Sequence, residues 1–471
     1  MTKHLLAVLL GASALTACAA GPDYQAPATP TTAAAPFIGA ASPAVSTAAA
    51  QDRWWTLYRD PLLNRLVDDA LAANADIRVA VARIERARAS LRGAKSDRLP
   101  RTGLGASANY TRTSDVQSLP GIDRENWVFD GGLDISYEVD LFGRVKRGVE
   151  ASRGDLAAAQ ADADGVRVAV IADTVRAYLD VTATAERLDV AQRTVALLDQ
   201  SIRITGARFE VGRSDRLDVI RVTALRDQQK AAIPGLEADR DAALFRLATL
   251  TGRTPQELPP TVRAAVRTPQ LAQPIPVGDG QALLARRPDV RAAERRLAAD
   301  TARVGVATAD LYPRITLGGS VGTTALGGNS LLGGGPLNFL LGPLISWAFP
   351  NQEAIRARIG TAKADSAASL AQFDGAVLQA LEETERALSV YAHAIERAQT
   401  LTAARDEAAR ATRISLARQR EGRIDFLTVL DAQRTLASAE ADLATATRAL
   451  SFAQVDLFRA LGGGWGQASR S

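Results

Sequence analysis

The chain has few of the residues that usually build active sites. Its 471 residues include one cysteine, Cys18, and two histidines. A single cysteine excludes a disulfide within the chain and a metal cluster held by several cysteines. One histidine, His4, belongs to a short apolar leader, and the other, His393, lies in a long helical run. The residue types therefore favour a conduit or a scaffold over an enzyme, and they predict no cofactor and no metal site.

One stretch matches a hydrolase motif. Residues 318–322 read Gly-Gly-Ser-Val-Gly, which fits the GxSxG pattern of a nucleophile elbow. That elbow needs a turn from a strand into a helix and a base within reach. Here the pattern lies inside a predicted strand and is followed by a glycine-rich stretch. We therefore expect no catalysis at Ser320.

Aromatic residues and unbalanced charge are also scarce. Aromatics make up 5% of the chain, the net charge is +4, and the sequence has no dense basic tract. Nucleic-acid binding therefore has little support. Apolar residues nevertheless reach 47%, and alanine is abundant among them. This composition favours closely packed helices over a core of bulky side chains.

Residues 1–17 are predicted to be a lipoprotein signal peptide. Two basic residues precede an apolar stretch that is too short to cross a bilayer. The leader ends in Leu15-Thr16-Ala17-Cys18, which resembles a bacterial lipobox. We expect Cys18 to become the mature N-terminus and to carry covalent lipid; the alternative is a small buried cysteine. Ala19 at the next position favours the outer membrane, by resemblance to bacterial lipoproteins.

Residues 18–50 are expected to form an acylated tether. The stretch Ala26–Ala50 is rich in alanine, proline, threonine and serine. Such a composition predicts an extended segment with no core of its own. Ordered structure is expected from residue 51 onward, and a single helix from Leu62 to Lys95.

A long internal duplication organises the rest of the chain. The stretch Ala207–Arg221 recurs as Ala417–Asp431, with alanine, arginine, glycine, aspartate, leucine and valine at matching places. The stretch 76–107 recurs at 289–320. A duplication of this length means that one structural unit is built twice. We place the first repeat at 51–253, an inter-repeat equatorial linker at 254–280, the second repeat at 281–464 and a C-terminal tail at 465–471.

Each repeat is predicted to contain two strands. They lie at about 102–113 and 127–139 in the first repeat, and at about 314–324 and 341–349 in the second. In the second of these strands, apolar and acidic residues alternate with period two. One face would carry Trp127, Phe129, Leu133, Ile135, Tyr137 and Val139, and the other Asp130, Asp134, Ser136, Glu138 and Asp140.

Each repeat is also predicted to contain a long helical hairpin, at 143–251 and 354–461. Helices of this length would reach roughly 80 Å. Gly212 and Gly422 fit the ends of helices at the two turns, and Pro234 predicts a kink in the first hairpin only. A strict apolar heptad predicts coiled-coil packing, with alanine three residues after each of its members. The heptad consists of Val429, Leu436, Leu443, Leu450 and Leu457.

These elements predict a mainly α fold with a membrane β-barrel part, built from a duplicated helix-strand-strand-long helical hairpin unit. Four strands cannot close a barrel, and an open sheet edge is not tolerated in lipid. The chain is therefore expected to oligomerise. Three copies would give a trimeric 12-stranded β-barrel, continued by a 12-helix α-barrel.

The sequence resembles the TolC-like outer membrane factors, the outer-membrane efflux proteins, in the lipoprotein branch that includes OprM and NodT. The resemblance covers nearly everything after Cys18. It is carried by Leu15-Thr16-Ala17-Cys18, Trp54-Trp55, the stretch from Tyr137 to Arg144, the turns at Gly212 and Gly422, the stretch from Leu427 to Arg434, and Leu461-Gly462-Gly463-Gly464-Trp465.

The resemblance implies a lipid-anchored homotrimer in the outer membrane, with its helical barrel in the periplasm. It would be the passive exit duct of a tripartite efflux system, carrying drugs, toxic compounds or metal ions. Its partners would be a periplasmic adaptor (membrane fusion) protein and an inner-membrane RND-type transporter. Two alternatives stay open: the exit duct of a type I protein-secretion system, and a coiled-coil lipoprotein scaffold without a pore.

The resemblance also implies two sites. The hairpin turns are expected to dock the adaptor, through Gly212, Arg213, Ser214 and Asp215 in the first repeat and Gly422, Arg423, Ile424 and Asp425 in the second. An acid at the place of Asp431 would point into the lumen near the closed periplasmic end. Pairing among Asp431, Arg221 and Asp218 would latch this gate. The alternative for both sets is that they are solvated surface residues.

Overall fold

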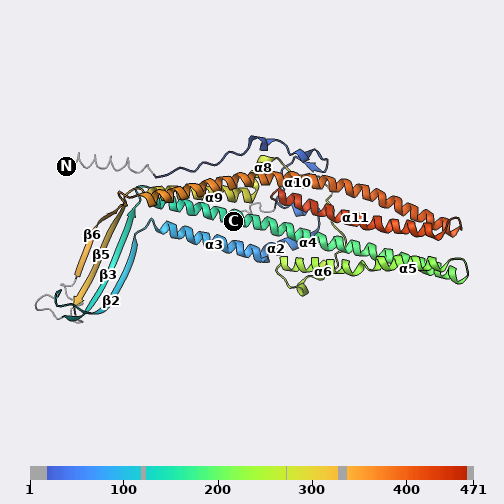
Figure 1. Ribbon diagram of the computed structural model, residues 1–471, viewed down its shortest axis with the longest axis horizontal. Helices are drawn as coiled ribbons and strands as arrows, with labels where there is room; N and C mark the ends of the chain where they lie inside the picture. Colours follow the sequence, from blue (N-terminus) through green and yellow to red (C-terminus); the bar gives the residue numbers. More distant parts are fainter. Residues whose placement is uncertain (1–18, 118–123, 272, 327–336, 464–471) are drawn as a thin grey trace. The chain divides into compact units, whose positions relative to one another are not determined.

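A computed structural model of the chain describes residues 19–117, 124–271, 273–326 and 337–463 (Figure 1). The chain forms two compact units. Unit 1 comprises Met1–Pro27, Arg83–Gln160 and Ala292–Asp374. Unit 2 comprises Ala28–Ala82, Ala161–Arg291 and Gly375–Ser471. Among the described residues, no helix has both the length and the apolar character that crossing a membrane requires.

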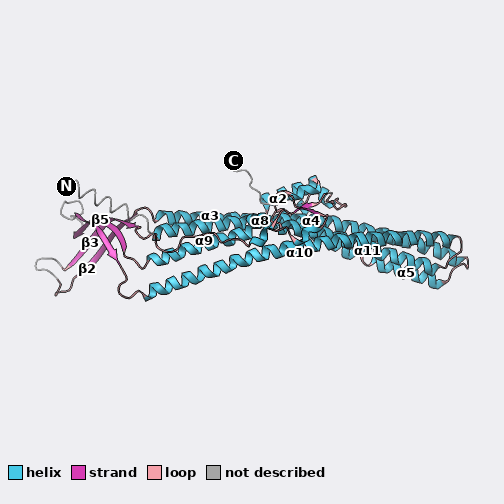
Figure 2. Ribbon diagram, turned by 90° about the horizontal axis from the view of Figure 1, so that it is seen from above, coloured by secondary structure: helices cyan, strands magenta, loops and turns pink. Residues whose placement is uncertain are grey.

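Unit 1 contains an antiparallel sheet of four strands (Figure 2). The strands are β2 (Arg101–Arg112), β3 (Glu125–Val139), β5 (Arg314–Leu326) and β6 (Leu337–Ser346), in the order β2-β3-β5-β6. The first three lie within two residues of their expected bounds. The strand expected at 341–349 is displaced toward its N-terminal end, because its pairing with β5 runs from Leu337 to Ser346. Trp347 and Phe349, expected on that strand, lie beyond it and stack with their rings 4.6 Å apart.

The two faces of this sheet differ in polarity, as the alternation predicts. Register places Leu133 opposite Val321, and Ile345 opposite Ile315, on one face. Asp134 lies opposite Ser320 on the other face. The apolar face is exposed in a single chain: Phe339 is 80% and Leu341 84% accessible. An exposed apolar face of this kind needs a partner or a lipid environment.

Unit 1 also contains parts of the helices α3 (Ala75–Ser96), α4 (Arg144–Glu210), α9 (Pro288–Ala309) and α10 (Glu353–Arg420). Small residues let α4 and α9 approach closely, since a Cβ added to Gly154 would lie 2.9 Å from the Cβ of Ala299. Arg303 on α9 forms an ion pair with Asp155 on α4 at 2.6 Å. These contacts fix the helices that continue from the strands.

Unit 2 contains the two helical hairpins except for the beginnings of α4 and α10, which belong to unit 1. The first runs from α4 through α5 (Arg216–Lys230) to α6 (Ile233–Leu250), and the second from α10 to α11 (Phe426–Ala460). The kink expected at Pro234 is a complete break, with α5 ending at Lys230. A proline removes the hydrogen bond to the carbonyl four residues earlier and clashes with it, and here that residue is Lys230. The second hairpin has no such break in α11.

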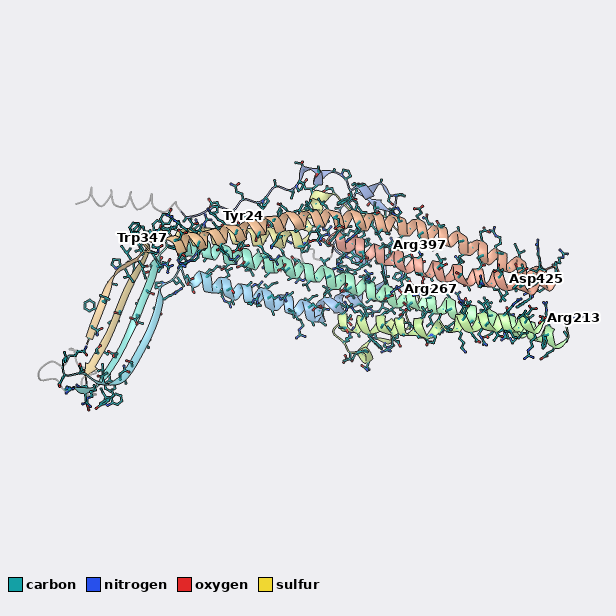
Figure 3. All side chains as sticks on the ribbon, in the orientation of Figure 1. Tyr24, Arg213, Arg267, Trp347, Arg397 and Asp425 are labelled. Atoms are coloured by element: carbon teal, nitrogen blue, oxygen red, sulfur yellow. The ribbon has the colours of Figure 1, made fainter. Side chains whose placement is uncertain are left out.

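The predicted heptad of α11 is its packing seam. Every member of the heptad, and every alanine three residues later, is buried or half-buried. Near the turns, Leu198 on α4, Val222 and Leu225 on α5, and Leu430 on α11 form one apolar cluster. The two hairpins therefore contact each other close to their turns. Figure 3 labels Arg213 and Asp425, one at each turn.

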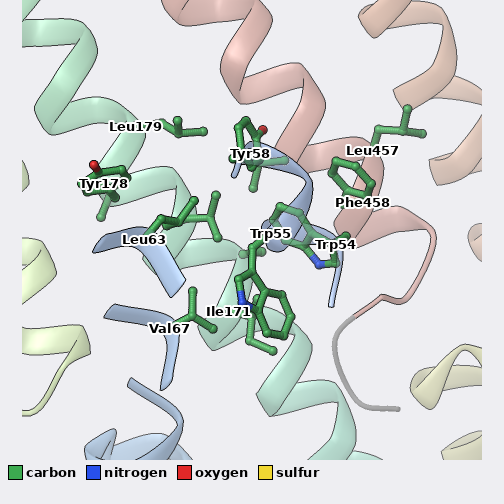
Figure 4. Close-up of a cluster of buried hydrophobic side chains, with 14 of the residues drawn as sticks. Trp54, Trp55, Tyr58, Leu63, Val67, Ile171, Tyr178, Leu179, Leu457 and Phe458 are labelled. Carbon is green, nitrogen blue, oxygen red and sulfur yellow. The ribbon is translucent and has the colours of Figure 1, made fainter. Parts of the chain in front are cut away.

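The main core of unit 2 surrounds the short helix η4 (Trp54–Tyr58) (Figure 4). Trp54 is 1% accessible and stacks on Phe458 of α11 with their rings 4.5 Å apart. Helix α2 (Pro61–Ala73) packs Leu63 into the same core. The N-terminal part of the chain is thus held against the last helix.

Two expectations about this region are wrong. The helix expected from Leu62 to Lys95 is two helices, α2 and α3 (Ala75–Ser96), separated at Asn74. The Asn74 side chain accepts from the backbone N–H of Asp76 and donates to the carbonyl of Leu250 at 3.0 Å. A partner 176 residues away therefore fixes the break.

The second correction concerns the described part of the tether, residues 19–50. It includes η2 (Thr31–Ala34), η3 (Ile38–Ala41) and β1 (Val45–Ser46), and Phe37 belongs to the core. The backbone N–H groups of Ile38 and Gly39 donate to the carboxylate of Glu385 at 2.7 and 3.0 Å. Residues 28–50 are therefore docked within unit 2 rather than extended. Cys18 lies outside the described residues.

The linker between the repeats also belongs to unit 2. Strand β4 (Ile275–Pro276) pairs in parallel with β1 of the N-terminal segment. The linker also contains the short helices η5 (Pro255–Glu257) and α7 (Pro260–Arg263), and α8 (Gly280–Arg286) then leads into α9. Ile275 is fully buried, so the linker contributes to the main core.

Candidate functional site

The two hairpin turns have the same backbone structure. At the first, the N–H of Gly212 donates to the carbonyl of Phe209 at 2.9 Å, and the N–H of Arg213 to that of Arg208 at 2.8 Å. At the second, Gly422 and Arg423 make the corresponding bonds at 3.0 and 2.9 Å. Both glycines have φ of 71°. Each turn is therefore a Schellman motif, in which glycine takes the left-handed conformation that ends a helix.

An aspartate begins the next helix at each turn. The Asp215 side chain accepts from the backbone N–H of Leu217 at 2.7 Å and caps α5. Asp425 caps α11, accepting from the N–H of Thr428 at 2.9 Å and from its hydroxyl at 2.5 Å. These bonds hold the pKa of the Asp425 carboxyl below its ordinary value. Both aspartates thus act as N-caps, which stabilise the start of a helix.

Most of the residues expected at the docking tips are accessible. Gly212, Arg213, Asp215, Gly422, Arg423 and Asp425 are exposed, and Ser214 and Ile424 are half-buried. A Cβ added at Gly212 or Gly422 would meet nothing within 4 Å. The turns therefore present a backbone surface that a partner could approach directly.

The three residues expected at the gate lie near these turns, but a single chain does not join them. Asp431 and Arg221 are exposed. Asp218 accepts from the hydroxyl of Ser214 at 3.1 Å. Within the described part of the chain, none of the three forms an ion pair with another of the set. The latch stays a prediction.

Asp431 lies on a polar stripe of α11. It occupies the same heptad position as Ser438, Thr445 and Arg459, which are exposed, and as Phe452, which is half-buried and interrupts the stripe. The neighbouring seam positions are buried or half-buried. The stripe therefore runs along the side of α11 that turns away from its packing neighbours.

Sequence reasoning missed a slot in unit 1 that holds the first described residues. The N–H of Ala20 donates to the carbonyl of Phe142 at 2.9 Å. Arg147, whose side chain is 4% accessible, forms an ion pair with Asp23 at 2.6 Å. A Cβ added to Gly305 on α9 would lie 2.9 Å from the carbonyl oxygen of Ala20. Nothing in the local sequence marks Gly305 or Arg147, because their partner is more than a hundred residues away.

A second missed feature joins α4 to α11. The Phe452 ring lies between two guanidinium groups, with Arg176 at 4.4 Å and Arg448 at 4.6 Å from its centre. Arg176 also forms an ion pair with Asp456 at 2.7 Å, and Arg448 with Asp180 at 2.6 Å. Such cation–π contacts add to the ion pairs that hold the two helices together.

Comparison with known proteins assigns the family. The sequence profile of the family described as "Outer membrane efflux protein" matches residues 66–253 and 280–463, one match for each repeat. The chain is similar to outer membrane protein OprJ of Pseudomonas aeruginosa, with 32% identity over 98% of this chain and 96% of that protein. It is 30% identical to the toluene efflux pump outer membrane protein TtgF of Pseudomonas putida, over 100% of this chain and 98% of that one.

A solved structure gives the same result. The outer-membrane channel OprN has a TM-score of 0.88 and 39% identity with this chain, covering 95% of it and 100% of OprN. The duplicated unit, the four strands and the two long hairpins thus occur together in a protein of known structure. The chain belongs to the outer membrane efflux protein family, the outer-membrane channels of efflux pumps.

Proposed function

We propose that three copies of this chain form a passive duct, through which an RND-type inner-membrane transporter expels small molecules across the periplasm and the outer membrane. An adaptor protein in the periplasm would join the two. The name of the toluene efflux relative supports small organic molecules as cargo. In a passive duct, the direction of transport would come from the pump.

The sheet carries this proposal. One of its faces is apolar and exposed, the other is polar, and β2 and β6 each have one unpaired edge. A sheet with open edges is not stable in lipid, whereas a closed ring of strands satisfies every backbone group. Joining β6 of one copy to β2 of the next closes such a ring. With three copies, the polar faces would enclose a wet channel and the apolar faces would meet lipid.

Native mass spectrometry and planar-bilayer recording of the purified full-length protein test the duct. We expect a trimer and a steady ion conductance. A monomer that conducts, or a trimer without conductance, would contradict the proposal. The second outcome would favour the non-pore scaffold. A type I protein-secretion duct predicts instead that deleting the gene blocks export of a protein and leaves sensitivity to small toxic compounds unchanged.

The adaptor would dock at the hairpin turns. The supporting observation is that both turns have the same backbone bonds and open space around Gly212 and Gly422. Valine at both positions should abolish efflux while trimers still form, because its side chain fills the space that a partner would occupy and strains the left-handed turn that would be recognised. The control variant is Ala224→Val. Ala224 is exposed on α5 outside the turns, so this change should leave efflux intact. Normal drug tolerance in the double mutant would count against docking at the turns.

The periplasmic end would be gated by three copies of Asp431. The supporting observation is its place on the exposed polar stripe of α11, one heptad after the turn. Three carboxylates in one ring would attract cations and repel anions. Arg221 and Asp218 on α5 would pair with Asp431 across helices or protomers when the duct is closed. Movement of the hairpins by an adaptor would separate them.

Cys18 would anchor the chain by covalent lipid. The supporting observation is the slot, which holds the chain from Ala20 to Asp23 beside Phe142, three residues after the end of β3. An anchor two residues before Ala20 would thus start near the ends of the strands. Several acyl chains at this point would bind the membrane firmly.

A further inference from the structure

Unit 2 has a cavity of about 530 Å³ that none of the proposals above uses. It lies between α4, α10, α11 and the beginning of α9. This volume is within the range of pockets that hold drug-sized ligands, about 300–1,000 Å³. Its walls combine apolar groups with three arginines, Arg287, Arg386 and Arg459.

On α10 and α11, the charged residues of the cavity lie on the side that faces away from the main core, while Ala387 and Ala453 lie at the border of that core. On α10, Glu385 and Leu388 contact the N-terminal segment at Ile38 and Gly39. The cavity is lined instead by Arg386 and Val390. At 100° per residue, the two sets lie on roughly opposite sides of the helix.

Helix α11 has the same division. Leu457 and Phe458 belong to the core, whereas the charged residues Asp456 and Arg459 line the cavity; Ala453 borders both. Arg459 shares its heptad position with Asp431, which the proposed duct places in the lumen. In that duct, the cavity would therefore be a recess in the inner wall.

The acidic groups of the cavity already have cationic partners. Arg287, whose side chain is 9% accessible, pairs with Asp289 at 2.6 Å and with Glu383 at 2.8 Å. Burial would raise the pKa of Asp289, but hydrogen bonding and the charge of Arg287 hold it below its ordinary value. Asp456 pairs with Arg176 at 2.7 Å. The carboxylate oxygens are thus engaged in short charge-assisted bonds.

Two arginines of the cavity are differently placed. Arg459 is exposed and, among the described residues, has no carboxylate within ion-pair distance. Arg386 has only Glu382 at 3.3 Å, an exposed contact one helical turn away. Exposed pairs of this kind are weak. The cavity therefore offers one unpaired and one weakly paired guanidinium group beside an apolar wall that includes Val168, Val390 and Ala453.

We propose that this cavity binds amphiphilic anions, with a carboxylate or sulfonate on Arg459 and Arg386 and the apolar part against the wall. Guanidinium groups hold such oxyanions through paired N–H donors. The site would retain anionic cargo in the wall of the duct. The role of this site in transport rests on the proposed function, whereas the binding of anions to the purified protein can be tested independently of that function.

Thiol labelling of the purified full-length protein tests the charge of the cavity. Cys18 is the only native cysteine, so the parent protein measures the background. In a Val390→Cys variant, we compare labelling by an anionic sulfonatoethyl methanethiosulfonate with labelling by its cationic trimethylammonium counterpart. The anionic reagent should react faster. Adding Arg386→Gln and Arg459→Gln should lower the ratio of the two rates about fivefold or more, because two cationic groups of the same cavity are removed. Arg397→Gln is the matched control, since Arg397 is exposed on α10 outside the cavity and should leave the ratio unchanged.

Protection tests recognition of the whole ligand. Naphthalene-2-sulfonate should slow labelling of the Val390→Cys thiol, and neutral naphthalene-2-sulfonamide should not. The protection should disappear when Arg459 is replaced by glutamine. Faster labelling by the cationic reagent, or equal protection by both naphthalenes, would overturn the proposal. A protein that passes these tests but gives no bilayer conductance would retain the anion site and lose the proposed duct.

Discussion

Three glycines at the ends of helices allow two contributions to the stability of a helix end to be separated, that of backbone conformation and that of packing. Gly212, Gly422 and Gly252 all have positive φ, of 71°, 71° and 67°. A Cβ at Gly212 or Gly422 would meet nothing within 4 Å. A Cβ at Gly252 would lie 2.8 Å from the carbonyl oxygen and 2.9 Å from the Cβ of Ala73. The three sites therefore share one backbone conformation but differ in available space.

Alanine substitution should reveal this difference. At Gly212 or Gly422 only the left-handed conformation is penalised, at about 1–2 kcal/mol. At Gly252 the close contact adds roughly 1–3 kcal/mol, the usual cost of overpacking. The Schellman bond donated by Arg213 should then open about 5- to 30-fold more often in Gly212→Ala. The corresponding bond donated by Arg253 should open more often still in Gly252→Ala.

Amide hydrogen exchange of the purified protein, read by mass spectrometry, measures these openings peptide by peptide. Gly212→Asn is the matched control, because asparagine tolerates the left-handed region and should give a smaller effect than alanine. Equal effects of alanine at Gly212 and Gly252 would refute the steric part of the reasoning. No effect of Gly212→Ala would refute the conformational part.

Four further predictions follow from other parts of the chain. Cys18→Ser should abolish incorporation of radioactive palmitate, and unchanged labelling would exclude Cys18 as the acylated residue. Asp431→Ala should weaken cation selectivity or raise conductance in planar bilayers, whereas traces identical to those of the wild type would remove Asp431 from the gate. Gly305→Val should expel the N-terminal segment from its slot and speed chymotrypsin cleavage after Tyr24 about tenfold. A tenfold change corresponds to the loss of roughly 1.5 kcal/mol, the usual contribution of a hydrogen bond to a charged group. Gly148→Ala is the control, because the space around Gly148 is open, and it should leave the cleavage rate unchanged. Because the pKa of Asp425 is lowered in the folded chain, its cap stabilises α11 fully at pH values above the ordinary carboxyl pKa of about 4, and this stabilisation is lost as pH falls through the lower folded pKa. Hydrogen exchange of the Thr428 amide, corrected for its intrinsic rate, should therefore become faster below about pH 4. Asp425→Asn should remove this pH dependence.

Features with a local pattern could be predicted from the sequence. The heptad of α11 and the glycines at the two turns mark the hairpins, because helix periodicity and left-handed backbone are properties of a few neighbouring residues. The alternation from Trp127 to Val139 likewise marks a strand with two different faces. The family profile matches both repeats that the duplication indicated.

Features that depend on distant partners could not be predicted. Asn74 ends α2 because its side chain reaches the carbonyl of Leu250. The N-terminal segment has the composition of a tether but docks on Glu385. The tip residues were located by their repeated glycine and aspartate, whereas Gly305 and Arg147 have no repeat or motif to mark them. Composition indicates the conformation that a segment favours in isolation, whereas the conformation of these segments is fixed by contacts with residues far away in the sequence.

The open edges of the sheet have a genetic consequence. In the proposed trimer every copy contributes both of its edges, so one defective β6 interrupts the whole ring. When a cell makes equal amounts of normal protein and a variant with a damaged β6, random mixing leaves about one trimer in eight free of the variant. A lesion in this strand should therefore act as a dominant-negative allele, while an allele that produces no protein should be recessive.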